Sequence, residues 1–175
     1  MKKRTSLITS LLLTSLGLSV MSSTHADSDS VYFKNPIGFA GTGCPAGTIS
    51  VNGVNSDTLS VLFDSYDAGY DSASGQRRRA SCSFAVPIHV PQGFQVSTMT
   101  ADWQGYAEGK TELKRKYFFA GQPHQPWITN KFNSSSGTDY LKRDTLEHAT
   151  LTWAGCGRDV ILRLNSNIRA NRSSY

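Results

Sequence analysis

The fold is decided by the stretch RASCSFAVPIHV, residues 79–90. Apolar side chains occupy every second position of it, namely Cys82, Phe84, Val86, Ile88 and Val90. Successive side chains of a strand point to opposite faces, so this alternation predicts one long strand with one buried face. Pro87 falls on the other face and has no N–H to donate, which predicts that it lies at a sheet edge or a bulge.

On either side of this stretch, short β-type runs alternate with turns that contain Gly or Pro. We expect strands near residues 31–33, 48–52, 58–66, 94–106, 113–120, 150–153 and 160–165, with a bulge near 97–98. We expect a break at 105–109 and a long surface loop over 121–138, with a short strand near 128–132. Because no apolar stripe recurs at helical spacing, the chain is predicted to be all-β, a single-domain antiparallel β-sandwich with long surface loops.

The first 26 residues have the pattern of a secretory signal peptide. Lys2, Lys3 and Arg4 precede an apolar run over residues 7–21, and small residues lead to Ala26. The apolar run is shorter than the roughly 20 residues of a membrane-spanning helix. We therefore expect a signal peptide at 1–26 and one β-sandwich domain at 27–175. The mature chain is predicted to be secreted, in the extracellular space, the periplasm or on the cell surface, without a transmembrane anchor.

Cleavage changes the charge of the chain. The full sequence has 18 Lys+Arg and 13 Asp+Glu, a net charge of +5. The signal peptide holds three of the basic residues and none of the acidic ones, which leaves 15 against 13, or +2. Proteins that bind nucleic acid present a concentrated basic face. A net charge of +2 gives no reason to expect nucleic acid as a partner.

Three cysteines, Cys44, Cys82 and Cys156, are available for disulfide bonding. Thiols of exported proteins tend to pair, so we expect one internal disulfide and one remaining thiol, with all three pairings open. The remaining thiol, if exposed, would link two chains into a dimer. None of the cysteines forms a CxxC pair, so we expect no metal site.

The sequence favours binding over catalysis. It contains no G-x-S-x-G elbow and its histidines are isolated, and we expect no catalytic residues and no cofactor. Candidate binding residues are the basic Arg77, Arg78, Arg79, Lys114 and Lys116, together with Trp127 as a flat platform for a sugar ring. Such a surface suits an anionic polysaccharide or another envelope polymer. The alternatives are a hydrolase of envelope or matrix polysaccharide and a structural matrix component.

Several short motifs occur in a fixed order along residues 38–169. They are Gly43-Cys44-Pro45, Val61-Leu62-Phe63-Asp64, Val90-Pro91-Gln92-Gly93-Phe94, Tyr117-Phe118-Phe119-Ala120-Gly121 and Trp153-Ala154-Gly155-Cys156-Gly157. In this set the chain resembles the secreted family called domain of unknown function 4360. The resemblance implies a small exported β domain and no established catalytic residues. It also implies a fourth cysteine beyond the position of Arg169; since this sequence ends at Tyr175, we expect one of the family's two disulfides to lack a partner.

The signal-peptide pattern gives a direct prediction about the exported protein. Cleavage after Ala26 should leave Asp27 as the first residue, because small side chains at Thr24 and Ala26 suit the peptidase. Intact-mass analysis of the exported protein measures this. An exported chain that still begins at Met1 would contradict it.

Overall fold

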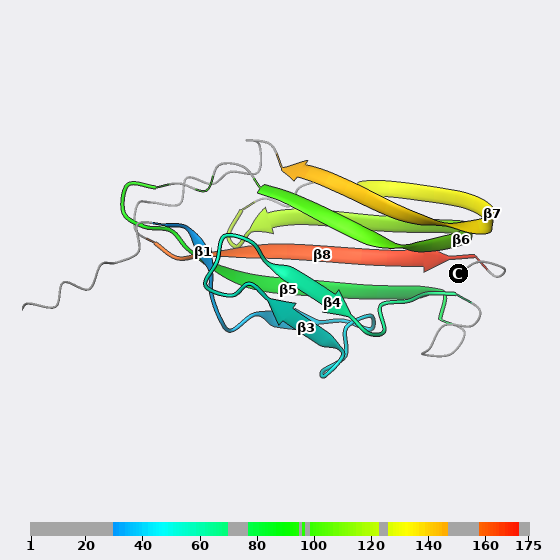
Figure 1. The fold of residues 1–175 in the computed structure, drawn as a ribbon, viewed down its shortest axis with the longest axis horizontal. Coiled ribbons are helices and arrows are strands. Elements are labelled where there is room, and N and C mark those ends of the chain that lie inside the picture. Colours follow the sequence, from blue (N-terminus) through cyan, green and yellow to red (C-terminus); the bar gives the residue numbers. More distant parts are fainter. Residues whose placement is uncertain are drawn as a thin grey trace, which may run out of the picture.

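The computed structural model describes residues 30–69, 77–94, 96, 99–122, 126–146 and 158–171. These residues form strands and no helix (Figure 1). The strands are β1 (Tyr32–Phe33), β2 (Gly38–Ala40), β3 (Ile49–Asn52), β4 (Ser60–Phe63), β5 (Arg79–His89), β6 (Met99–Phe119), β7 (Ile128–Leu146) and β8 (Val160–Ala170). Every strand pairing is antiparallel, and the chain is an all-β sandwich as predicted.

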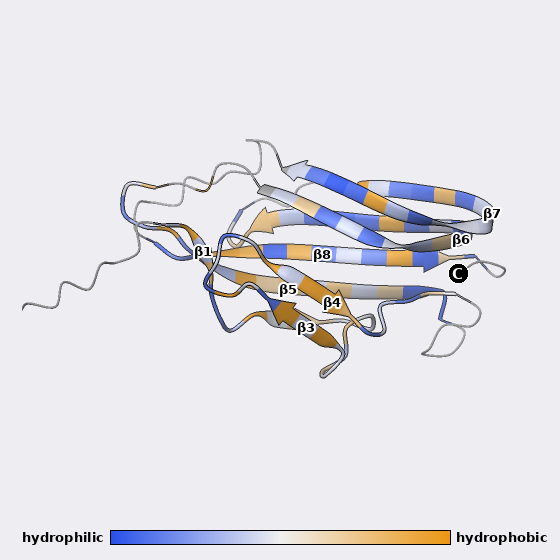
Figure 2. Cartoon of the chain, viewed as in Figure 1, coloured by the Kyte–Doolittle hydropathy of each residue, from blue (hydrophilic) through white to orange (hydrophobic). Residues whose placement is uncertain are grey.

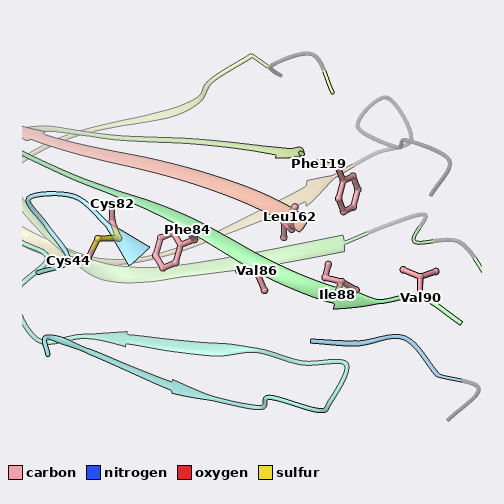
Figure 3. Packing of buried hydrophobic residues seen from close by; sticks show 8 residues of the cluster. All are labelled: Cys44, Cys82, Phe84, Val86, Ile88, Val90, Phe119 and Leu162. Atoms are coloured by element: carbon pink, nitrogen blue, oxygen red, sulfur yellow. A yellow bond between two sulfur atoms is a disulfide. The ribbon is translucent and has the colours of Figure 1, made fainter. Parts of the chain in front are cut away.

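The main sheet has the strand order β1-β5-β8-β6-β7, and β2 also pairs with β5. Its central strand β5 matches the predicted strand, and the five alternating apolar side chains of residues 82–90 are all buried. They form a core cluster with Phe119 and Leu162, which Figure 3 shows along the length of β5. The alternation of residues 79–90 was therefore sufficient to identify the centre of the sheet.

The position predicted for Pro87 was wrong in part. This proline does not lie on an edge strand, because β5 pairs with β8 on one side and with β1 and β2 on the other. The Pro87 carbonyl accepts a hydrogen bond from the Lys34 N–H, so the missing N–H also faces the β1–β2 side. On that side β1 ends at Phe33 and β2 begins at Gly38. The neighbouring strand is interrupted where Pro87 cannot donate, which makes the proline tolerable.

Two further predictions were wrong, and both concern β6 and β7. Residues 121–138 are not one long loop, because β7 begins at Ile128. Residues 105–109 do not end a strand, because β6 continues through them. The register of the β6–β7 pair changes there. Ala107 pairs with Thr138 and Gly109 pairs with Ser134, so β6 advances by two residues where β7 advances by four. The two additional residues of β7 form a bulge, and bulges bend a strand pair.

The bend folds the β6–β7 hairpin back on itself. A straight strand rises about 3.3 Å per residue, so Trp103 and Tyr117 would lie roughly 46 Å apart along β6. Instead, the Trp103 Nε1–H donates to the Tyr117 hydroxyl at 2.7 Å. Likewise, the rings of Phe132 and Tyr140 on β7 stack with centroids 4.7 Å apart. Both strands reverse direction near the same end of the molecule in Figure 1.

The folded-back half of the hairpin and the β3–β4 hairpin make the second layer of the sandwich. Residues 99–107 of β6 pair with 138–146 of β7 in this layer, while residues 111–119 of β6 pair with β8 in the main sheet. Val61 and Phe63 of β4 pack against the core cluster. Figure 2 shows hydrophobic residues concentrated on β3 and β4, and alternating hydropathy along β8.

The disulfide joins Cys44, in the turn after β2, to Cys82 of β5. Both residues are buried. This disulfide is one of the three cysteine pairings that the sequence left open. Cys156 lies outside the described residues, as does the strand expected at 150–153.

Removing the Cys44–Cys82 bond should destabilise the protein. The bond closes a loop with a sequence separation of 38, and the chain-entropy model gives about 4 kcal/mol for a loop of that length. The Cys44→Ala/Cys82→Ala double variant should therefore unfold at a lower urea concentration than the wild type. Cys156→Ala is the matched control, with an unchanged midpoint. If reductant left the wild-type midpoint unchanged, the bond would have no stabilising role.

Candidate binding surface

The face of the main sheet that points away from the second layer is rich in basic side chains. The register of β5, β8, β6 and β7 arranges its side chains in four rows, and we call this surface the outer sheet face. The rows are Arg79–Arg169–Glu112–Lys131, Ser81–Asn167–Lys114–Thr129, Ser83–Asn165–Lys116 and Ala85–Arg163–Phe118. They contain six basic residues and one carboxylate.

The alternation of β6 decides which of its residues reach this face. Leu113, Arg115 and Tyr117 are buried on the inner side. Lys114 and Lys116 therefore point outward together, as the sequence predicted. Lys114 forms an ion pair with Glu112 at 3.3 Å, and both side chains are partly exposed.

Lys116 and Trp127 lie together, which sequence spacing alone could not show. The Lys116 ammonium lies 4.9 Å from the centroid of the Trp127 ring and 5.6 Å from that of Phe118. A cation above an aromatic face at such distances is attracted by the ring's quadrupole. Trp127 is 45% exposed, so its ring remains available to a ligand.

The three consecutive arginines do not act as one cluster. Arg77 donates a hydrogen bond to the Thr42 carbonyl, before β5 begins. Arg78 is exposed at the start of the strand, and its carbonyl accepts from the Ala170 N–H. Only Arg79 lies in a row of the outer sheet face, directly opposite Arg169. Of the three, Arg79 is the one that adds to the basic surface formed by β8 and β6.

Sequence reasoning missed Lys131, Arg163 and Arg169. Each of these residues alternates with apolar or half-buried residues on its strand, so the sequence pattern did indicate that its side chain points outward. What the sequence lacked was the register that places these residues beside Lys114 and Lys116.

The inner side of β6 contributes a buried polar network instead of a binding surface. Arg115 donates through Nε and Nη2 to the two carboxylate oxygens of Asp144, both at 2.6 Å. The Tyr117 hydroxyl donates to the same carboxylate at 2.7 Å and accepts from Trp103. Arg115 is only 1% exposed.

Burial determines the protonation of this network. It raises the pKa of the Tyr117 hydroxyl, and the hydrogen bond to Asp144 raises it further, so this hydroxyl keeps its proton and donates. Burial also opposes the charge of Arg115, but the hydrogen bonds and charge of Asp144 outweigh it and raise the pKa of the guanidinium. The guanidinium thus keeps its charge, and its contact with Asp144 joins the two halves of the folded hairpin.

The match to a family model covers residues 35–175, and the family is described as Domain of unknown function (DUF4360). The chain belongs to the DUF4360 family. An uncharacterized secreted protein of Arthroderma benhamiae is 30% identical over 149 residues, which cover 82% of this chain and 60% of that relative. The chain thus spans 60% of the relative's length. That relative is a secreted protein, in agreement with the export expected for this DUF4360 chain.

Among solved structures, that of TmCBM61 in complex with β-1,4-galactotriose matches with a TM-score of 0.35 and 9% identity. The match covers 80% of this chain and 81% of the other. This similarity is too low to bear on the ligand of the DUF4360 chain. The described part of the chain holds no helix long and apolar enough to cross a membrane.

The Arg115–Asp144 pair should be essential for the folded hairpin. Asp144→Asn leaves the buried guanidinium without a counter-charge, which typically costs about 3–5 kcal/mol. We expect the variant to unfold at a much lower urea concentration. Arg143→Ala removes an ion pair with Asp102, which is largely solvent-exposed, and should change stability by less than about 1 kcal/mol. Equal losses for the two variants would contradict the role assigned to the buried pair.

Proposed function

We propose that the protein is a secreted, non-enzymatic binding protein whose outer sheet face holds an anionic extracellular or envelope polymer. The observation that supports this most is the set of six basic side chains on four adjacent rows, with Glu112 as the one carboxylate among them. Carboxylate, sulfate and phosphate groups all accept charge-assisted hydrogen bonds from Lys and Arg. A polysaccharide or other envelope polymer that carries such groups is the expected partner.

The geometry of a sheet suits an extended chain. Neighbouring strands lie about 4.8 Å apart, and side chains on one face recur about every 6.7 Å along a strand. Lys114 and Lys116 are separated by one such step, and Arg163 and Arg169 by three. A linear polymer can therefore contact several of these cations at once.

Trp127 adds a preference for sugars over other polyanions. The C–H groups of a pyranose form apolar faces that pack on aromatic rings, and Trp127 lies beside Lys116. Asn165 and Asn167 occupy the rows between Arg163 and Arg169, and their amides can donate to and accept from hydroxyl groups. The surface thus combines charge, hydrogen bonding and a stacking platform.

Retention on heparin and on polygalacturonate columns tests the proposal. Lys116→Ala, Arg163→Ala and Arg169→Ala should each elute earlier than the wild type. By analogy with nucleic acid, each lost contact should reduce the logarithmic salt dependence by roughly 0.7–0.9. Trp127→Ala should weaken retention on the polysaccharide without altering that dependence.

Arg143→Ala is the matched control for these variants. It removes one exposed positive charge on β7, in the folded-back half that belongs to the second layer. Its retention should equal that of the wild type. If Arg143→Ala eluted as early as Lys116→Ala, the attraction would come from total charge and the outer sheet face would not be the site.

A further inference from the structure

A second surface lies on the opposite side of the main sheet. A groove with a volume of about 1140 Å³ runs between β4 and the first half of β6. Residues 57–63 form one wall and residues 100–107 the other, and Phe84, Val86 and Leu164 of the main sheet are part of its floor. We call it the inter-hairpin groove. Its volume exceeds the roughly 300–1,000 Å³ of pockets that hold drug-sized ligands.

Both walls present strand edges that pair with nothing in the described part of the chain. There, β4 pairs only with β3, and residues 99–107 of β6 pair only with β7. The N–H and C=O groups on the facing edges are thus open to a ligand. Thr111, which also lines the groove, has a buried hydroxyl without a hydrogen-bond partner.

Aromatic rings line the groove along its length. Phe63 of β4 and Trp103 of β6 stack with centroids 6.5 Å apart. Tyr66 and Tyr140 also line it, and burial raises the pKa of both hydroxyls, so these phenols stay neutral at physiological pH. Tyr106, 55% exposed, lies at the rim.

The charge of the groove is opposite to that of the outer sheet face. Its charged lining residues are Asp57, Asp67, Asp102, Glu112 and Arg169. Glu112 and Arg169 share a row of the outer sheet face, so both side chains point to the other side of the sheet. Of the remaining acids, Asp102 forms an ion pair with Arg143. Asp57 and Asp67 would repel a polyanion, so we expect a ligand without negative charge.

We propose that the inter-hairpin groove binds a neutral oligosaccharide chain. Sugar hydroxyls both donate and accept, so they can meet the unpaired donors and acceptors of the two strand edges. The apolar faces of the sugar rings cover the aromatic side chains of the walls. A purely apolar ligand would leave the strand edges unsatisfied. This site is independent of the outer sheet face.

Two tryptophans report separately on the two surfaces. The Trp103 indole N–H is bonded to Tyr117 beside the groove, whereas Trp127 lies next to Lys116 on the outer sheet face. The mature chain is titrated with neutral hexasaccharides of β-1,4-glucose, β-1,3-glucose and β-1,4-N-acetylglucosamine, each to about 5 mM, enough to detect millimolar binding. The three indole resonances are followed by NMR and assigned with Trp127→Phe and Trp153→Phe, which leaves the third signal to Trp103. At least one hexasaccharide should shift the Trp103 signal and leave Trp127 unchanged.

A variant in the groove completes the test. Leu164→Tyr fills part of the floor and should weaken binding at least tenfold. Leu141→Ala, an exposed residue of β7 outside the groove, is the control and should bind as the wild type does. A urea midpoint of unfolding equal to that of the wild type shows that a variant is folded.

Three results would overturn the proposal: no hexasaccharide shifts Trp103; the neutral sugars shift Trp127 instead; or Leu164→Tyr, shown to be folded, binds as tightly as Leu141→Ala. The first and third results do not bear on the outer sheet face, whose ligands are anionic. The second would place the binding of neutral sugars on that face, beside Trp127, instead of in the groove.

Discussion

The bidentate contact between Arg115 and Asp144 holds together two parts of the hairpin that would otherwise extend apart. Ion pairs removed from water recover their desolvation cost only with good geometry and additional hydrogen bonds. Here both carboxylate oxygens accept from the guanidinium, and Tyr117 adds a third bond. The folded-back half of the hairpin depends on this contact, because residues 99–107 and 138–146 pair only with each other within the described part of the chain.

The bend that brings these groups together requires particular residues. At Gly137 the backbone has a φ of +78°, and an added Cβ would lie 1.7 Å from the Tyr106 hydroxyl oxygen. Any larger residue would therefore displace the ring of Tyr106 as well as strain the backbone. Across the pair, the ring of Tyr140 similarly covers Gly105. Glycine facing an aromatic ring on the neighbouring strand is a recognised way of stabilising a bent sheet.

This arrangement explains which strands could be predicted from the sequence and which could not. The alternation of residues 79–90 identified β5 because its inner face is uniformly apolar. Of β7 the sequence predicted only a short strand near 128–132. The inner face of β7 holds Asn130, Ser134, Lys142 and Asp144 among the aromatic Phe132 and Tyr140, a mixture that has no period in hydropathy. The partner of Asp144, for example, is Arg115 on the opposite half of the hairpin, 29 residues away in the sequence. A single sequence does not show that two residues so far apart in the chain are in contact.

The outer sheet face could not be predicted either, because a single sequence does not give the register of the strands. The structure also bears on why basic residues lie on this face. Lys and Arg commonly protect exposed sheet edges from pairing with other chains. That explanation suits Lys131 on β7, which pairs on one side only within the described residues. It does not suit Lys114, Arg163 and Arg169, because each of them has a paired residue on both neighbouring strands. Moreover, Arg79 stands directly opposite Arg169, an arrangement of like charges that destabilises a sheet. The anionic ligand that we propose for this face would offset the repulsion between Arg79 and Arg169.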